Sequence, residues 1–227
     1  MITTAPELIY MLKVNIGIAL FYAFYKLFCC RDTFFQWRRI ALLSFLALSF
    51  LYPLMDMQAW VKEQPAINEL ADYYTLMMLT ETNTSTATVV TTPVAIPTPG
   101  LLDIIKFIYW IGILLLSARF MIQLSSIFHL VLKSKSINVD QISIRSLSEP
   151  ANPFSFWQWI FVYLPELKED EKQEILTHEQ THVRQWHSID VIISEIVNII
   201  CWMNPFAWLM KTEIRLNLEY LADHKVM

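Results

Sequence analysis

Three long apolar stretches alternate with polar segments in the first 133 residues. They cover residues 8–28, 40–57 and 101–118, and the third continues as a helical extension. A helix of about 20 apolar residues crosses a hydrocarbon layer of about 30 Å, so each stretch is expected to be a membrane span. No basic residue precedes the first stretch and no small-residue cleavage site follows it, which disfavours a cleaved signal peptide.

Basic residues mark one end of each expected span. They are Lys26, Arg31, Arg38 and Arg39 between the first two spans, and Lys133 and Lys135 after the third. Because cytoplasmic loops are enriched in lysine and arginine, these ends should face the cytoplasm. The N-terminus and the loop at residues 56–100 should then lie outside.

The pattern changes after residue 133, and residues 134–227 are expected to form a second domain beside the membrane domain at 1–133. Apolar and polar residues alternate at 137–147, and residues 156–163 are rich in β-branched and aromatic side chains. These two patterns predict two or three short strands. The acidic segment 166–174 is typical of a helix start. Residues 189–203 and 205–224 should form two antiparallel helices, broken at Asn204-Pro205, rather than a fourth span. The expected fold is a mainly α membrane protein with a small α+β domain.

Composition agrees with a membrane protein, because 55% of residues are hydrophobic and 14% are aromatic. A formal net charge of −4 disfavours direct nucleic-acid binding. Three cysteines make neither a disulfide framework nor a zinc ribbon. The sequence matches no phosphate-binding loop and has only three glycines, which makes nucleotide chemistry an unlikely function.

The pentad His178-Glu179-Gln180-Thr181-His182 carries the clearest chemistry. On a helix the two histidines lie one turn apart on one face, where both can bind a single Zn²⁺, and Glu179 can act as general base. Only about 0.006 matches to this pattern are expected by chance in this composition. Farther along the chain, Glu219 is the expected third ligand, and Asp223, one turn later, the expected partner of a zinc-bound histidine.

Other residues near the pentad have less specific roles. His187 is nine residues from His178, about 180° around the helix, and should face away from the metal as a structural or substrate-side residue. Trp202, Phe206 and Trp208 should pack on the membrane surface or in the core. A possible substrate strand, which would pair with an extended protein substrate by β-addition, contains Phe156, Trp157, Gln158, Trp159 and Ile160.

These motifs resemble the BlaR/MecR-type antirepressor metallopeptidases, which are bacterial multi-pass zinc proteases. The most specific matching stretches are Pro153-Phe154-Ser155-Phe156, residues 175–190, Trp202-Met203-Asn204-Pro205-Phe206 and residues 219–223. The resemblance implies a gluzincin domain on the cytoplasmic side of the inner membrane, which cleaves a cytoplasmic transcriptional repressor, itself or both. It implies His178, His182 and Glu219 as zinc ligands and Glu179 as the base.

The sequence also departs from that pattern and leaves alternatives open. Such receptors usually have a further span and a sensor domain after the protease, and no Ser-x-x-Lys motif occurs here. One alternative is a non-proteolytic signalling or scaffold receptor with a structural zinc site. Another is a housekeeping membrane peptidase of the prenyl-protein or heat-shock type. The expected partners are the lipid bilayer and a protein substrate, and a homodimer is an alternative to a monomer.

Overall fold

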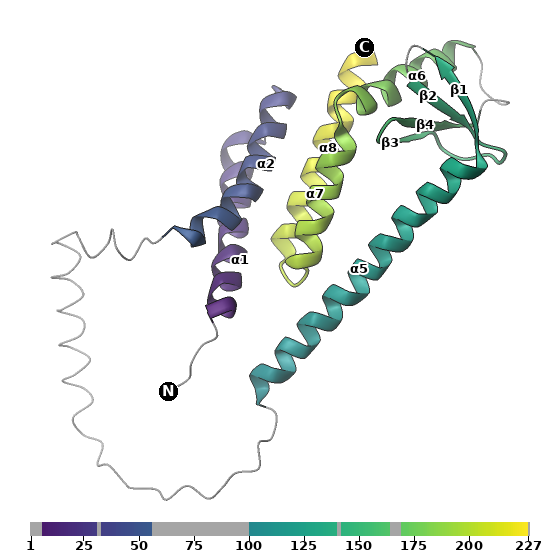
Figure 1. Ribbon diagram of the computed structural model, residues 1–227. Helices are drawn as coiled ribbons and strands as arrows, with labels where there is room; N and C mark the ends of the chain where they lie inside the picture. Colours follow the sequence, from purple (N-terminus) through teal and green to yellow (C-terminus); the bar gives the residue numbers. More distant parts are fainter. Residues whose placement is uncertain (1–5, 31–32, 56–99, 140–141, 164–168, 227) are drawn as a thin grey trace, which may run out of the picture.

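The computed structural model describes residues 6–30, 33–55, 100–139, 142–163 and 169–226 (Figure 1). Its architecture is mostly helical, with one small sheet. Among these residues, the first part contains three long apolar helices, and the second contains four strands and three helices. The helices are α1 (Pro6–Phe24), α2 (Phe35–Leu51), α5 (Leu101–Lys133), α6 (Glu169–Arg184), α7 (His187–Ile200) and α8 (Pro205–Val226).

Within the described ranges, three helices are long and apolar enough to cross a membrane, as the hydrophobic pattern predicts. Their spans are Glu7–Cys29, Phe35–Leu54 and Leu101–Lys133. A π-helical turn at Tyr25–Cys29 extends α1, and a 3₁₀ turn at Tyr52–Leu54 extends α2. The second span begins five residues earlier than predicted, because the helix also includes Gln36, Arg38 and Arg39. Most of the predicted outer loop, at residues 56–99, lies outside the described residues.

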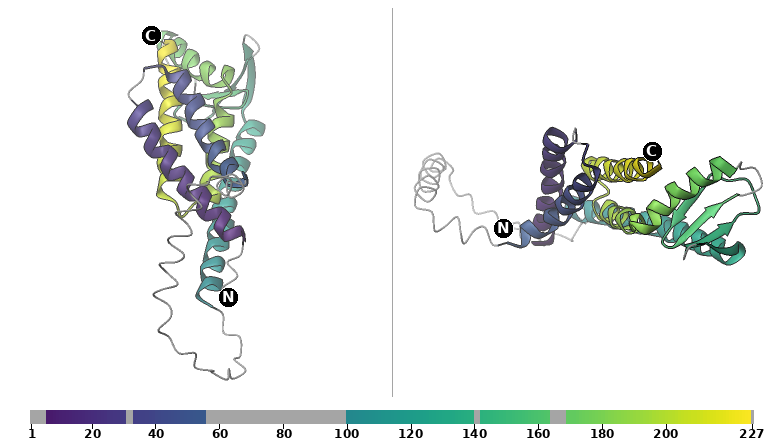
Figure 2. Two further views of the ribbon diagram at one scale, coloured as in Figure 1. Left: turned by 90° about the vertical axis from the view of Figure 1, so that its left-hand side faces the viewer. Right: turned by 90° about the horizontal axis from the view of Figure 1, so that it is seen from above.

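The sheet contains four strands, where two or three were predicted. They are β1 (Lys135–Val139), β2 (Ile142–Ser146), β3 (Phe154–Phe156) and β4 (Trp159–Val162). Their order is β1-β2-β4-β3, with β2 and β4 parallel and the other two pairs antiparallel. Helix α6 packs on β3 and β4. The sheet and α6 lie on one side of the molecule and α1 with α2 on the other (Figure 2).

Helices α7 and α8 form the predicted antiparallel hairpin, which lies between these two parts (Figures 1 and 2). Helix α8 buries a stripe of apolar residues at spacings of three and four against α1 and α2, in a cluster that includes Tyr25, Leu42 and Leu46. The α8 members of this stripe are Met210, Ile214, Leu218 and Leu221. The core therefore joins residues on both sides of position 133.

The tip of this hairpin reaches the middle of the candidate spans. Asn204 Nδ2 donates to the carbonyl oxygen of Asn15 in α1 at 3.1 Å. The Tyr109 hydroxyl of α5 donates to the carbonyl oxygen of Ile200 at 2.8 Å, and the Trp202 indole lies against Gly112. Buried polar partners satisfy backbone groups that lipid could not. Trp202 is thus partly buried against α5, while Phe206 and Trp208 stay about two-fifths exposed.

Polar contacts attach the other end of the hairpin to the first two spans. Lys26 Nζ lies 2.6 Å from Glu213 Oε1, and Arg39 Nε lies 2.6 Å from Asp190 Oδ2. Asp190 is only 3% exposed, so its charge is compensated rather than solvated. These contacts fix the height of α8 along α1, and residues beyond Glu213 extend past the basic end of the first span.

Candidate metal centre

Helix α6 brings the two histidines of the pentad together. Residues 178 and 182 are one helical turn apart, and their Nε2 atoms lie 3.2 Å from each other. Helix α6 packs against the sheet, at β3 and β4, and also against α8. Both imidazoles lie on the side of α6 that meets α8, next to Glu219. The side chains are partly buried, which holds the rings at one surface of the helix.

Helix α8 supplies the distant carboxylate because its apolar stripe fixes its rotation. At 100° per residue, Glu219 lies about 140° and Asp223 about 180° from Ile214, on the face opposite that stripe. Since the stripe faces α1 and α2, this opposite face meets α6. Glu219 Oε2 lies 3.5 Å from Nε2 of His178 and 3.9 Å from Nε2 of His182.

These three donors fit a tetrahedral metal. With metal–nitrogen bonds of 2.0–2.1 Å, ligand atoms around tetrahedral Zn²⁺ lie about 3.3 Å apart. The observed separations of 3.2, 3.5 and 3.9 Å bracket this value. Two imidazoles and one carboxylate are also the donor set of many catalytic zinc sites. Glu219 is 58% exposed, so solvent can reach a fourth position.

Each histidine has a second partner on the nitrogen that faces away from the shared centre. His178 Nδ1 lies 3.0 Å from Oδ1 of Asp223, the residue predicted as the partner of a zinc-bound histidine. His182 Nδ1 lies 2.8 Å from Nδ1 of His187. Such partners fix the ring orientation of metal-binding histidines.

The prediction that His187 faces away from the centre is wrong, because α6 does not continue through residue 187. Trp186 adopts a left-handed conformation, with φ 57° and ψ 35°, and a new helix starts at His187. No glycine or proline marks this break, so helical periodicity alone missed it. His187 is only 2% exposed and turns back towards His182.

Burial sets the protonation of the central groups. It raises the pKa of the Glu179 carboxyl above its usual value; a hydrogen bond from Ser155 and the nearby His178 oppose this shift, and Glu219 adds to it. Burial lowers the pKa of His182, which favours the neutral imidazole that binds metals. Burial also lowers the pKa of His187, to about 3, so this ring is neutral at pH 7. A carboxylate with a raised pKa is a suitable general base.

A cleft of about 470 Å³ opens beside these groups. It is lined by Pro153, Glu174, Ile175, His178, Glu179, Asp223 and Val226. Glu179 and His178 therefore share an open cavity with apolar and acidic walls. This arrangement can hold a chain segment next to the metal centre.

The predicted substrate strand needs a correction. Trp159 and Ile160 lie in β4, which pairs with β2 on one side and β3 on the other, and Trp157 and Gln158 form the turn between β3 and β4. These residues offer no free strand edge. Of the predicted set, Phe156 lies on β3, the outer strand of the sheet, which packs beside α6.

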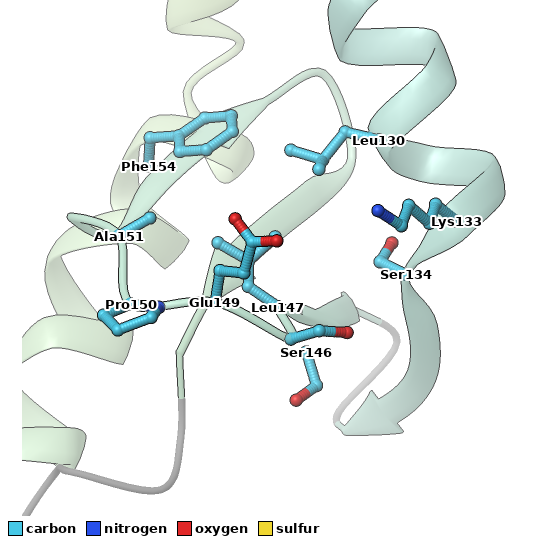
Figure 3. Close-up of a pocket in the computed structure, with 10 residues that line it drawn as sticks. Leu130, Lys133, Ser134, Ser146, Leu147, Glu149, Pro150, Ala151 and Phe154 are labelled. Carbon is cyan, nitrogen blue, oxygen red and sulfur yellow. The ribbon is translucent and has the colours of Figure 1, made fainter.

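A second cavity of about 210 Å³ lies away from the metal centre, between the end of α5 and the loop before β3 (Figure 3). Lys133 and Glu149 are its charged residues, and its lining contains neither histidine nor cysteine. Among the described residues, the group His178, His182 and Glu219 is the one whose donor atoms converge closely enough to hold a metal. The chemistry of this chain therefore centres on the larger cleft.

Comparison with known proteins gives one family match. The family model described as BlaR1 peptidase M56 matches residues 11–227, which is nearly the whole chain. The search of curated proteins found no match to the chain.

Proposed function

Because the chain belongs to the BlaR1 peptidase M56 family, we propose that it is a membrane-embedded zinc metalloendopeptidase with a gluzincin-like catalytic domain. The observation that carries this proposal is the convergence of His178, His182 and Glu219 from two helices, with Glu179 beside them in an open cleft. When bound, Zn²⁺ would polarise the scissile carbonyl and acidify a water molecule.

Residues of the chain bind the metal, orient its ligands, transfer the proton and hold the substrate. His178, His182 and Glu219 hold the metal, and Asp223 orients His178. Glu179 accepts a proton from water in the cleft and returns it to the leaving amine, which its burial and raised pKa favour. The substrate is a protein segment, and β3 is the strand whose outer edge could pair with it.

We further propose an antirepressor role in the bacterial inner membrane, with cleavage of a cytoplasmic repressor, the chain itself or both. Three candidate spans support a multi-pass topology. The candidate metal centre lies towards the same end of the bundle as Lys26 and Arg39, and by the positive-inside rule this supports a cytoplasmic site with the N-terminus outside. Helix α5 touches the tip of the α7–α8 hairpin, where the Tyr109 hydroxyl donates to Ile200 at the end of α7, so the third span contacts the helix that begins next to the candidate metal centre.

The test uses the full chain purified in detergent and loaded with zinc. Fluorescently labelled casein serves as an unfolded protein substrate, and intact mass spectrometry follows self-cleavage. The variant Glu179→Gln should keep its zinc and lose about 10²–10⁴-fold in cleavage rate. The matched variant Glu149→Gln changes a carboxyl group outside this cleft and should cleave as the wild type does. Undiminished cleavage by zinc-loaded Glu179→Gln would refute the assigned base.

The antirepressor role has its own test. Co-expression with winged-helix repressors from the source genome should give repressor fragments with the wild-type chain but not with Glu179→Gln. Zinc-bound protein that cleaves neither a repressor, casein nor itself would favour a non-proteolytic receptor. Cleavage of casein without cleavage of any repressor would favour a housekeeping peptidase.

A further inference from the structure

A chain of hydrogen-bonding groups leads from the metal centre to the second span. His182 Nδ1 lies 2.8 Å from His187 Nδ1, and His187 Nε2 lies 3.2 Å from Gln185 Oε1. The backbone carbonyl of Gln185 accepts a hydrogen bond of 2.8 Å from Nη2 of Arg39 in α2. The same guanidinium pairs with the buried Asp190 at the start of α7.

Only one arrangement of protons satisfies this chain when His182 binds a metal through Nε2. A neutral imidazole bound through Nε2 carries its proton on Nδ1, so His182 must donate to Nδ1 of His187. His187 then carries its proton on Nε2 and donates it to the side-chain oxygen of Gln185. Every ring nitrogen along the chain is thus satisfied, and the tautomer of His182 is fixed.

The backbone at Trp186 is what makes this contact possible. In a continuous helix, His187 would lie about 140° around the axis from His182. The left-handed conformation of Trp186 turns the chain instead, although this backbone conformation is unfavourable for a non-glycine residue. The Trp186 ring packs edge-on against the Trp157 ring, with 5.2 Å between their centroids. The backbone of Trp157 also has a positive φ, of 55°. Strain of this kind persists where surrounding contacts over-determine it.

We propose that His187 is a positioning residue that holds His182 in the tautomer and rotation required to bind the metal, with Gln185 holding His187 in turn. Without an acceptor at this place, the His182 ring could rotate and present a carbon atom instead of Nε2. Arg39 fixes the backbone of Gln185, so the second span also supports the metal centre. This inference rests on the proposed zinc site.

The test measures metal binding by the full chain in detergent, after removal and return of the metal. Zn²⁺ affinity is measured by competition with a fluorescent chelator, and the visible absorption of Co²⁺-loaded protein reports ligand geometry. His187→Phe keeps the ring shape but removes the acceptor, and should weaken Zn²⁺ binding about 10–100-fold and change the Co²⁺ spectrum. His187→Asn keeps an acceptor oxygen near the Nδ1 position and should restore most of both.

Two further variants make the result decisive. His129→Phe changes an exposed histidine on α5 and should bind both metals as the wild type does. Gln185→Leu removes the acceptor for His187 Nε2 and should weaken Zn²⁺ binding several-fold; it carries the test if His187→Phe does not fold. Wild-type affinity in either His187→Phe or Gln185→Leu would overturn the proposal, as would equal losses in His187→Phe and His187→Asn. If the wild type bound no zinc, the proposed function itself would fail.

Discussion

The contact between α5 and the tip of the α7–α8 hairpin gives a prediction with a calculable size. Gly112 lies directly against the Trp202 indole, and a Cβ atom added at residue 112 would lie 2.4–2.7 Å from three indole atoms. Carbon atoms in ordinary contact lie about 3.5–4.0 Å apart, so Gly112→Ala must push the ring or the helix by about 1 Å. The ring cannot turn away freely, because its Nε1 donates to the carbonyl oxygen of Tyr109 at 3.3 Å.

Two effects of opposite sign therefore act in Gly112→Ala. Overpacking costs about 1–3 kcal/mol, while alanine is better than glycine in a helix by about 1 kcal/mol. A double-mutant cycle separates them, because Trp202→Ala removes the ring and leaves only the gain in helix propensity. The expected coupling between the two positions is about 1–3 kcal/mol, which corresponds to about 2–12 °C in the midpoint of thermal unfolding for a protein of this size.

The measurement is circular dichroism at 222 nm during heating of the detergent-purified chain and its three variants. Gly112→Ala should lower the midpoint of the wild type and raise that of Trp202→Ala. Additive effects of the two substitutions, within about 0.5 kcal/mol, would refute the close contact between α5 and the hairpin.

Three further predictions concern the metal centre. Asp223→Asn should weaken Zn²⁺ binding about 10-fold, the lower end of the usual range because Asp223 is half exposed, and chelator competition measures this. Glu179→Gln should raise the free energy of unfolding of the metal-free protein at pH 8, because the raised pKa of Glu179 means that folding disfavours its carboxylate form. This gain should vanish below the pKa of Glu179 in the unfolded chain, where the carboxyl group is protonated in both states. An equal gain at pH 4 and pH 8 would contradict the prediction. Metal-free protein should lose about 2 kcal/mol of stability between pH 7 and pH 5, because the pKa of the buried His187 is lowered to about 3 and the unfolded chain takes up the proton below about 6.5. Denaturant unfolding at both pH values checks the last prediction, with His187→Phe as the control that lacks the His187 contribution to this loss and should therefore lose less stability than the wild type.

Local pattern was enough to locate the candidate spans and the two histidines of the candidate metal centre. Apolar stretches of membrane length identify helices because a bilayer requires a continuous hydrogen-bonded segment, and the described part of the chain contains three such helices. The pentad identifies His178 and His182 because a helix places residues four apart on one face, whatever surrounds them. The break at Asn204-Pro205 likewise predicts the hairpin, since proline cannot continue a helix interior.

Local pattern could not predict which residue partners His182 or which strand edge lies near the cleft. The partner of His182 depends on one left-handed residue, Trp186, which has no glycine or proline signature and is held by the distant Trp157. The strand edge near the cleft depends on sheet order, because β4 pairs on both sides only once β2 lies beside it. Both features depend on residues far apart in the sequence, so no short stretch of sequence predicts them.

The sequence by itself determined which segments can cross a membrane and which side chains can bind a metal, because both follow from the periodicity and chemistry of neighbouring residues. Tertiary structure alone decided that Glu219 reaches the two histidines, that His187 supports one of them and that the hairpin tip lies among the spans. These relations depend on how the apolar stripe of α8 packs against α1 and α2, and such packing is a property of several segments together rather than of any one.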